Sequence, residues 1–91
     1  MTAKTFSTLR ATIFQDPRAI ASQAYADGML LAYNEAEQHP QKVDKFLAWA
    51  KRRKTMIAHD QNYTKRDRNL NAGKITGYQN AKEALKYGNS L

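Results

Sequence analysis

Residues 16–37 read DPRAIASQAYADGMLLAYNEAE, and this stretch decides the fold class. Asp16 is suited to cap a helix, and Pro17 stands at the first helical position, where a proline costs no hydrogen bond. Apolar side chains then recur with the helical period on two adjoining sides. The two sides are Ile20, Ala24 and Leu31, and Tyr25, Met29, Ala32 and Ala36. The pattern predicts a helix over 18–38 that is apolar around much of its circumference and lies centrally, with Gly28 allowing close helix packing.

Three further helices are expected around this stretch. An upstream helix over 5–15 carries apolar residues at helical spacing. Downstream, His39-Pro40 favours an extended link, because the residue before a proline avoids the α region. A long third helix over 41–70, with Gly73 suited to cap its end, and a fourth over 76–87 follow. The three apolar stripes are Phe6, Leu9, Ile13 and Phe14; Val43, Phe46, Leu47, Ala50 and Ile57; and Tyr78, Ala81 and Leu85.

No stretch of the sequence alternates apolar and polar residues as a half-buried strand would. The sequence therefore predicts an all-α fold, a small bundle of three to four helices with a long basic third helix, in a single domain of residues 1–91. Cysteine is absent, which excludes disulfides and thiolate metal sites. The first residues lack the apolar run of a signal peptide, and no run is long enough to span a membrane. A cytoplasmic location with no membrane partner is expected.

The positive charge is concentrated in one segment. The chain carries a net charge of +7. Residues 42–68 hold nine lysine and arginine residues against three aspartates, a net +6, whereas residues 1–41 have a net −1 and residues 69–91 a net +2. Seven of the cations fall within KRRKTMIAHDQNYTKRDR, residues 51–68. Such an excess favours a polyanionic partner, an acidic protein surface or, more simply, a solvated helix face.

The leading hypothesis is a non-enzymatic module that contacts nucleic-acid backbone, DNA or RNA, through residues 51–68. If the third helix is continuous, its two cationic clusters lie about 21 Å apart along one rod. Tyr63 lies between them as a candidate for base stacking. No residue stands out as a base reader, so little sequence specificity is expected. The candidate phosphate contacts are Lys51, Arg52, Arg53, Lys54, Lys65, Arg66 and Arg68.

The alternative is a protein-binding modulator or inhibitor. In this interpretation the basic helix docks on an acidic surface of a larger assembly, one that processes nucleic acid, for example. Trp49 and Met56 would anchor it, because they lie beside the apolar stripe and such residues are enriched at interface centres. A simpler interpretation is that both side chains widen the buried face. Self-association of the chain into a homo-oligomer is a further alternative.

Catalytic signals are weak. His39 and His59 stand twenty residues apart without a metal-ligand spacing between them. No serine has a neighbouring base in sequence, and the carboxylates of Asp27, Glu35 and Glu37 lack a second element to pair with. The sequence predicts no catalytic residues, no metal site and no cofactor.

Overall fold

A computed structural model describes residues 3–88 of the protein, with side chains described for residues 5–87. Over this range the chain is helical and contains no strand, which confirms the expected all-α class. Five α-helices are joined by short connections that include two 3-10 helices, Ile13–Gln15 and Pro40–Lys42. The α-helices are α1 (Ala3–Ala11), α2 (Pro17–Ala21), α3 (Gln23–Gln38), α4 (Val43–Ala58) and α5 (Lys65–Gly88). None of the helices in this range is long and apolar enough to cross a bilayer.

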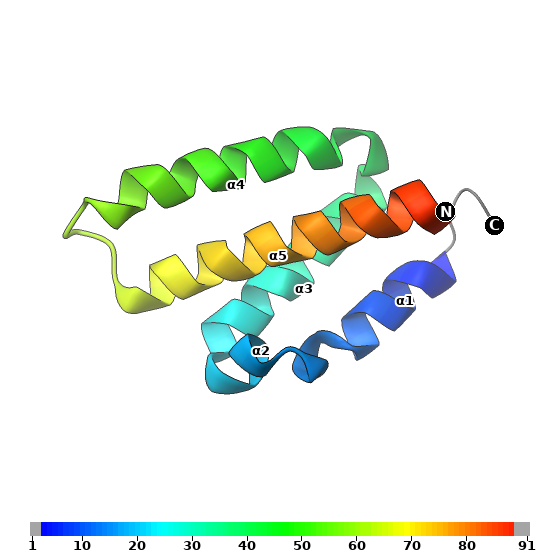
Figure 1. The fold of residues 1–91 in the computed structure, drawn as a ribbon, viewed down its shortest axis with the longest axis horizontal. Helices are drawn as coiled ribbons and strands as arrows, with labels where there is room; N and C mark the ends of the chain where they lie inside the picture. The colour runs from blue at the N-terminus through cyan, green and yellow to red at the C-terminus, as the bar shows by residue number, and fades with distance from the viewer. Residues whose placement is uncertain (1–2, 89–91) are drawn as a thin grey trace.

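The arrangement centres on α3 and α5. Figure 1 shows α5 running the length of the molecule, with α4 along one side and α3 crossing behind it. The shorter α1 and α2 pack mainly against α3. The two helices α3 and α4 each pack on α5 but make almost no direct contact with each other. The central position expected for the second helix is therefore shared between α3 and α5.

The helix expected over 18–38 is interrupted at Ser22. The caps explain the division: Asp16 Oδ1 accepts a hydrogen bond from Arg18 N at 2.9 Å and starts α2, while Ser22 Oγ accepts one from Tyr25 N at 3.2 Å and starts α3. The break turns Ile20 outward, where it is 69% exposed. Burial was therefore wrongly expected for Ile20, and also for Leu31, whereas the side formed by Tyr25, Met29, Ala32 and Ala36 is buried.

The packing of α3 on α5 depends on three glycines, here called the glycine seam: Gly28, Gly73 and Gly77. A Cβ on Gly28 would lie 2.1 Å from the carbonyl oxygen of Leu70, and one on Gly73 would lie 2.0 Å from that of Tyr25. The two backbones therefore touch directly. This confirms close helix packing at Gly28. A C-cap at Gly73 was wrong, because this residue lies inside α5.

The core fills the space between α3, α5 and the inner side of α4. The apolar stripe expected for the third helix is confirmed: Val43, Leu47, Ala50 and Ile57 are buried and Phe46 is partly buried. Tyr78, Ala81 and Leu85 likewise face the core from α5. In the upstream stripe Phe6 and Ile13 are buried and Leu9 packs against the core, but Phe14 is 58% exposed, contrary to expectation.

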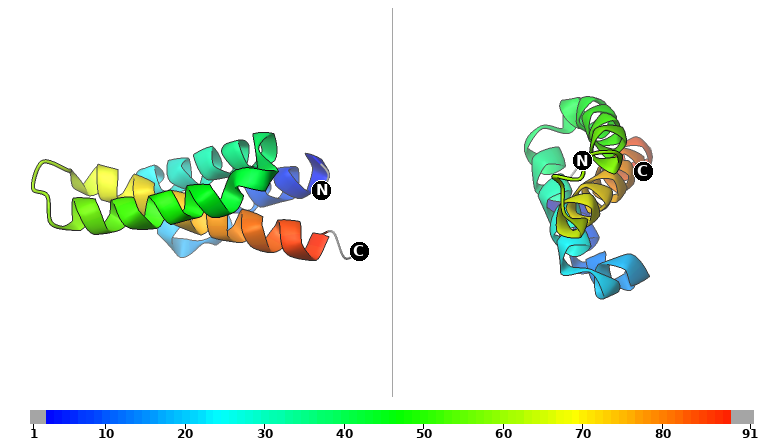
Figure 2. Two further views of the ribbon diagram at one scale, coloured as in Figure 1. Left: turned by 90° about the horizontal axis from the view of Figure 1, so that it is seen from above. Right: turned by 90° about the vertical axis from the view of Figure 1, so that its left-hand side faces the viewer.

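The third helix is much shorter than expected. It ends at Ala58 rather than near residue 70, and residues 59–64 form a turn that reverses the chain. Residues 65–70, assigned from sequence to the third helix, instead begin the 24-residue α5, which also absorbs the helix expected over 76–87. Figure 2 shows α4 and α5 as two antiparallel arms joined at one end of the molecule.

Candidate functional site

Residues 51–68 form the end of a helical hairpin, called the cationic hairpin below. Its turn is held by local hydrogen bonds. Asp60 Oδ1 accepts from Asn62 N at 2.9 Å, as in an Asx turn. Thr64 and Asp67 form a capping box, because Thr64 N donates to Asp67 Oδ2 at 3.0 Å and Asp67 N donates to Thr64 Oγ1 at 3.2 Å. These bonds stop α4 and start α5 without a proline or a glycine.

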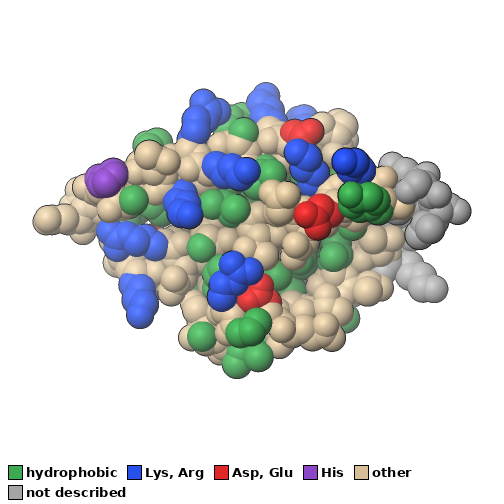
Figure 3. Space-filling view, viewed as in Figure 1, with side chains coloured by type: hydrophobic (Ala, Val, Ile, Leu, Met, Phe, Trp, Pro, Cys, Tyr) green, Lys and Arg blue, Asp and Glu red, His purple; other side chains and the backbone are tan. Residues whose placement is uncertain are grey.

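The reversal changes the geometry of the two cationic clusters. Lys51, Arg52, Arg53 and Lys54 lie on the last turns of α4, while the three other cations lie on the first turn of α5. A separation of about 21 Å along one rod is thus wrong. The clusters stand on neighbouring packed helices, whose axes are typically about 8–10 Å apart. In Figure 3 basic side chains are spread over α4 and reach the end of the molecule where α4 and α5 are joined.

All seven cations of the cationic hairpin are exposed. Within the described part of the chain, no carboxylate forms a salt bridge with any of them. The two acids of this segment serve the turn instead. Hydrogen bonds from the Thr64 backbone and hydroxyl, aided by the charges of Arg53 and Arg66, hold the pKa of Asp67 below its ordinary value. Arg68 is tied to the turn as well, since its Nη2 donates to the carbonyl oxygen of Asp60 at 3.2 Å.

Tyr63 has a partner within the protein. The Arg53 guanidinium carbon lies 5.4 Å from the centre of the Tyr63 ring, a cation–π contact across the turn. The side chain is only partly exposed. A base could stack on Tyr63 only on a ring face that Arg53 leaves free.

Trp49 and Met56, the expected anchor residues, are both exposed. Their exposed fractions are 49% and 67%, so they do not simply widen the buried face. Together with Arg52 and Arg53 they line one shallow hollow on α4. The Trp49 ring is flanked by Lys45, whose Nζ lies 5.1 Å from the ring centre. An apolar surface and cations therefore share this face of α4.

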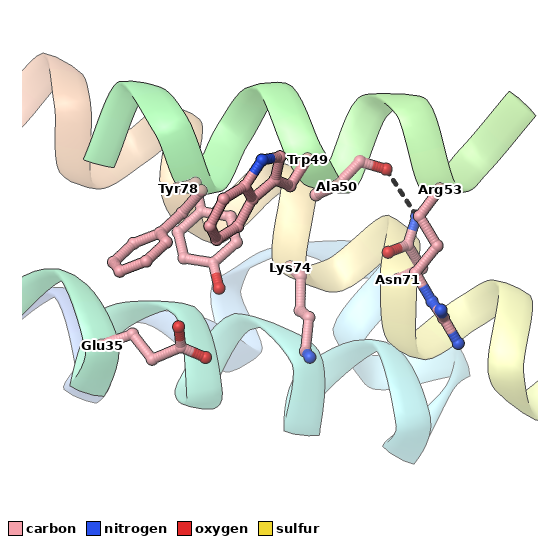
Figure 4. A pocket seen from close by; sticks show the side chains of 8 residues that line it. Glu35, Trp49, Ala50, Arg53, Asn71, Lys74 and Tyr78 are labelled. Atoms are coloured by element: carbon pink, nitrogen blue, oxygen red, sulfur yellow. Dashed lines mark hydrogen bonds between the residues drawn. The ribbon is translucent and has the colours of Figure 1, made fainter. Parts of the chain in front are cut away.

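A groove opens beside this hollow, because α3 and α4 both pack on α5 but not on each other. Its volume is about 220 Å³. In Figure 4, Trp49 and Arg53 reach down from α4, while Lys74 and Tyr78 extend from α5 toward the α3 side that holds Glu35. The groove is lined by Glu35, Phe46, Trp49, Ala50, Arg53, Asn71, Lys74 and Tyr78.

Two polar groups of the groove are fixed by the fold. Asn71 is buried, and its Nδ2 donates to the carbonyl oxygen of Ala50 at 2.9 Å, linking α5 to α4. Burial, together with the nearby Glu35 carboxylate, raises the pKa of Tyr78, so this hydroxyl stays protonated at neutral pH. The cations that line the groove are Lys74 and Arg53, and Arg53 also contacts the Tyr63 ring.

The two histidines are not brought together. His39 lies before α4 and His59 follows its last residue, so the 16-residue helix separates them by about 24 Å. No three histidine, aspartate or glutamate side chains of residues 5–87 cluster as metal ligands would.

Sequence reasoning missed the groove and the turn. The turn had a signal, because Thr64-Lys65-Arg66-Asp67 matches the capping-box pattern. The groove residues Asn71, Lys74 and Tyr78 had none, since their role depends on how α3 and α4 are placed on α5.

Comparison with known proteins assigns the chain to no family. No family model, no curated protein and no solved structure matches the sequence or the fold. The geometry of the cationic hairpin and the groove is therefore the basis for a functional proposal.

Proposed function

We propose that the cationic hairpin binds the phosphate backbone of a nucleic acid, without catalysis and with little sequence preference. The observation that carries this proposal is the reversal at residues 59–64, which sets two exposed groups of cations side by side on α4 and α5. Seven cations without a salt-bridge partner among residues 3–88 exceed what solvation of a helix requires. Phosphate contacts release condensed counterions, which gives such a surface strong, sequence-independent affinity.

The proposal predicts a steep dependence on salt. If about five of the seven cations contact phosphates of duplex DNA, the affinity falls roughly 500-fold between about 50 and 200 mM salt. For a single strand the same five contacts give a fall of roughly 100-fold. Binding should be measured by fluorescence anisotropy with labelled DNA and RNA at both salt concentrations.

The sharpest variant reverses two charges at the start of α5. Lys65→Glu with Arg66→Glu places acids in the first turn of a helix, where the helix dipole favours negative charge, so the fold should be retained. Binding at about 50 mM salt should weaken at least tenfold, and the salt dependence should become shallower. The matched control is Lys42→Glu with Lys86→Glu, which lies outside the cationic hairpin. Each reversal removes two charges, so both double variants lower the net charge from +7 to +3.

The outcomes separate local contact from overall charge. Equal weakening by both double variants would mean that net charge alone attracts the nucleic acid. Absence of binding by the unmodified protein even at about 50 mM salt would contradict the proposal, because phosphate-driven affinity is strongest there.

A second function is favoured by a separate observation, the exposure of Trp49 and Met56 beside Arg52 and Arg53. Here the same face of α4 docks on an acidic protein surface, with cations giving orientation and the two apolar side chains giving affinity. This function predicts that a protein partner binds in a stoichiometric amount and stays bound after nuclease treatment. Trp49→Ala should abolish this binding, and its affinity should depend only mildly on salt. Loss of every partner on nuclease treatment would refute it.

A further inference from the structure

We infer that the preferred ligand is a single strand, and that one unpaired base stacks on Trp49 at the mouth of the groove between α3 and α4. This inference rests on the proposed nucleic-acid function and names the substrate class. It also assigns Trp49 to the nucleic acid rather than to a protein partner.

The Trp49 ring is a supported and accessible platform. It is half exposed, and Phe46 packs against it with the ring centres 6.2 Å apart. Phe46 in turn contacts the buried Tyr78 at 5.6 Å, so the three rings form a continuous series from α4 into the core. A platform fixed in this way requires little ordering when a ligand binds, which favours affinity.

Cations border this platform along a path suited to a strand backbone. Lys45 Nζ lies over the Trp49 ring, 5.1 Å from its centre, so the base stacks on the part of the ring that Lys45 leaves open. Arg53 and Lys74 both line the groove and a second hollow that adjoins it. Arg53 also lines the shallow hollow on α4 that contains Trp49. Phosphates on either side of a stacked base could therefore meet Lys45 at one end and Arg53 with Lys74 at the other.

The acids nearby do not block this path. Glu35 lies on the α3 side of the groove, where it faces the hydroxyl of Tyr78. Asp67 lines the adjoining hollow, but its carboxylate accepts hydrogen bonds from Thr64 in the capping box. Among the residues that line the groove, the cations Arg53 and Lys74 thus stand against a single carboxylate, that of Glu35.

The stacking platform explains why a single strand is preferred. In a duplex the faces of the bases are stacked on each other, so only the backbone is available to the protein. An unpaired base offers its face to an aromatic ring, and this contact tolerates any sequence. A duplex should therefore bind only through the cationic hairpin, whereas a single strand should gain the groove contacts as well.

Trp49 is the one tryptophan of the chain, so the tryptophan fluorescence of the protein directly reports a base that stacks on this ring. A single strand of about 20 nucleotides should quench its fluorescence at about 50 mM salt, and the matched duplex should not. Trp49→Ala should weaken single-strand binding roughly tenfold or more and leave duplex binding unchanged. Trp49→Phe should restore most of the affinity. Ile20→Ala removes an apolar side chain of α2 that is even more exposed, 69% against 49% for Trp49. It is the control variant and should change the binding of neither ligand.

Lys74→Ala provides a test that leaves the aromatic series intact. It should weaken single-strand binding and reduce the magnitude of its logarithmic salt dependence by about 0.7, with no effect on the duplex. The inference would be overturned if single strand and duplex bind equally, if neither quenches the Trp49 fluorescence and if Trp49→Ala has no effect. The proposed function would then still stand. Failure of both ligands to bind at low salt would overturn the two together. Binding to an acidic protein that depends on Trp49, with no binding of nucleic acid, would assign the face to protein docking instead.

Discussion

Replacing Gly73 with alanine should force α5 away from α3. The new Cβ would lie 2.0 Å from the carbonyl oxygen of Tyr25 and 2.8 Å from its carbonyl carbon, whereas ordinary contacts begin at 3.4 Å. Both atoms belong to the backbone, so no change of rotamer relieves the overlap. The two helices must separate by about 1 Å or more, and the contacts of Met29 and Ala32 with α5 are loosened along with those of Tyr25.

The expected loss of stability follows from two opposing effects. Alanine favours a helix interior over glycine by about 1 kcal/mol. Overpacking a tight contact costs about 1–3 kcal/mol and occasionally more, and the upper end of this range or above applies here because both clashing atoms belong to the backbone. We expect a net destabilisation of about 2 kcal/mol or more, out of a total of roughly 5–14 kcal/mol for a chain of 91 residues. The melting temperature should fall by about 8–16 °C.

Thermal and urea denaturation followed by far-UV circular dichroism measure this loss. Gly77→Ala provides a comparison, because its Cβ would meet a side-chain atom, the Cβ of Ala32, at 2.6 Å. Adding Ala32→Gly should therefore recover part of the stability lost by Gly77→Ala. Thr55→Ala, at an exposed position of α4, should change stability by less than about 0.5 kcal/mol. If Gly73→Ala melts at or above the temperature of the unmodified protein, the backbones of α3 and α5 are not in contact and the reasoning fails.

Two further predictions concern polar contacts. Asn71→Ala should lower the free energy of unfolding by about 0.5–1.5 kcal/mol, because it removes the buried hydrogen bond from Asn71 Nδ2 to the Ala50 carbonyl oxygen that links α5 to α4; an unchanged denaturation midpoint would contradict this. Asp67 has a pKa below its ordinary value of 3.8, so its carboxylate stabilises the fold above that pH, and this contribution is lost as the pH falls through the lower folded value. The stability difference between the unmodified protein and Asp67→Asn should shrink between about pH 7 and pH 3 in urea denaturation, and a constant difference would refute the assignment.

The sequence predicts the helical class and several helix starts for clear reasons. Pro17 and Pro40 stand at the beginnings of α2 and of the 3-10 helix before α4, because a proline in the first turn needs no backbone donor. The stripe from Val43 to Ile57 fixes the buried side of α4. The exposure of Ile20 could not be predicted by extending one helical period, because the cap at Ser22 ends α2 and starts α3 in a new direction.

The candidate site was only partly predictable. Exposure of the seven cations follows from their charge. Their grouping depends on the reversal at residues 59–64, which contains no glycine or proline and which the helix period does not locate. The capping-box residues Thr64 and Asp67 indicate only where the next helix starts. To predict the groove from the sequence, one would have to know that α3 and α4 do not pack on each other. Lys74 and Tyr78 acquire a role only because α3 and α4 both pack on α5 and leave a groove between them.

The attachment of α4 to one side of α5 has a consequence for the order in which the protein opens. Elements with few neighbours unfold locally at a lower free energy than the rest of the molecule. The contact between α3 and α5 is the most extensive in the fold, whereas α4 is held mainly along one side. Amide hydrogens of α4 should thus exchange with solvent before those of α3. A ligand that bridges the groove would contact α4 on a second side. Its binding should therefore slow the exchange of the amide hydrogens of α4.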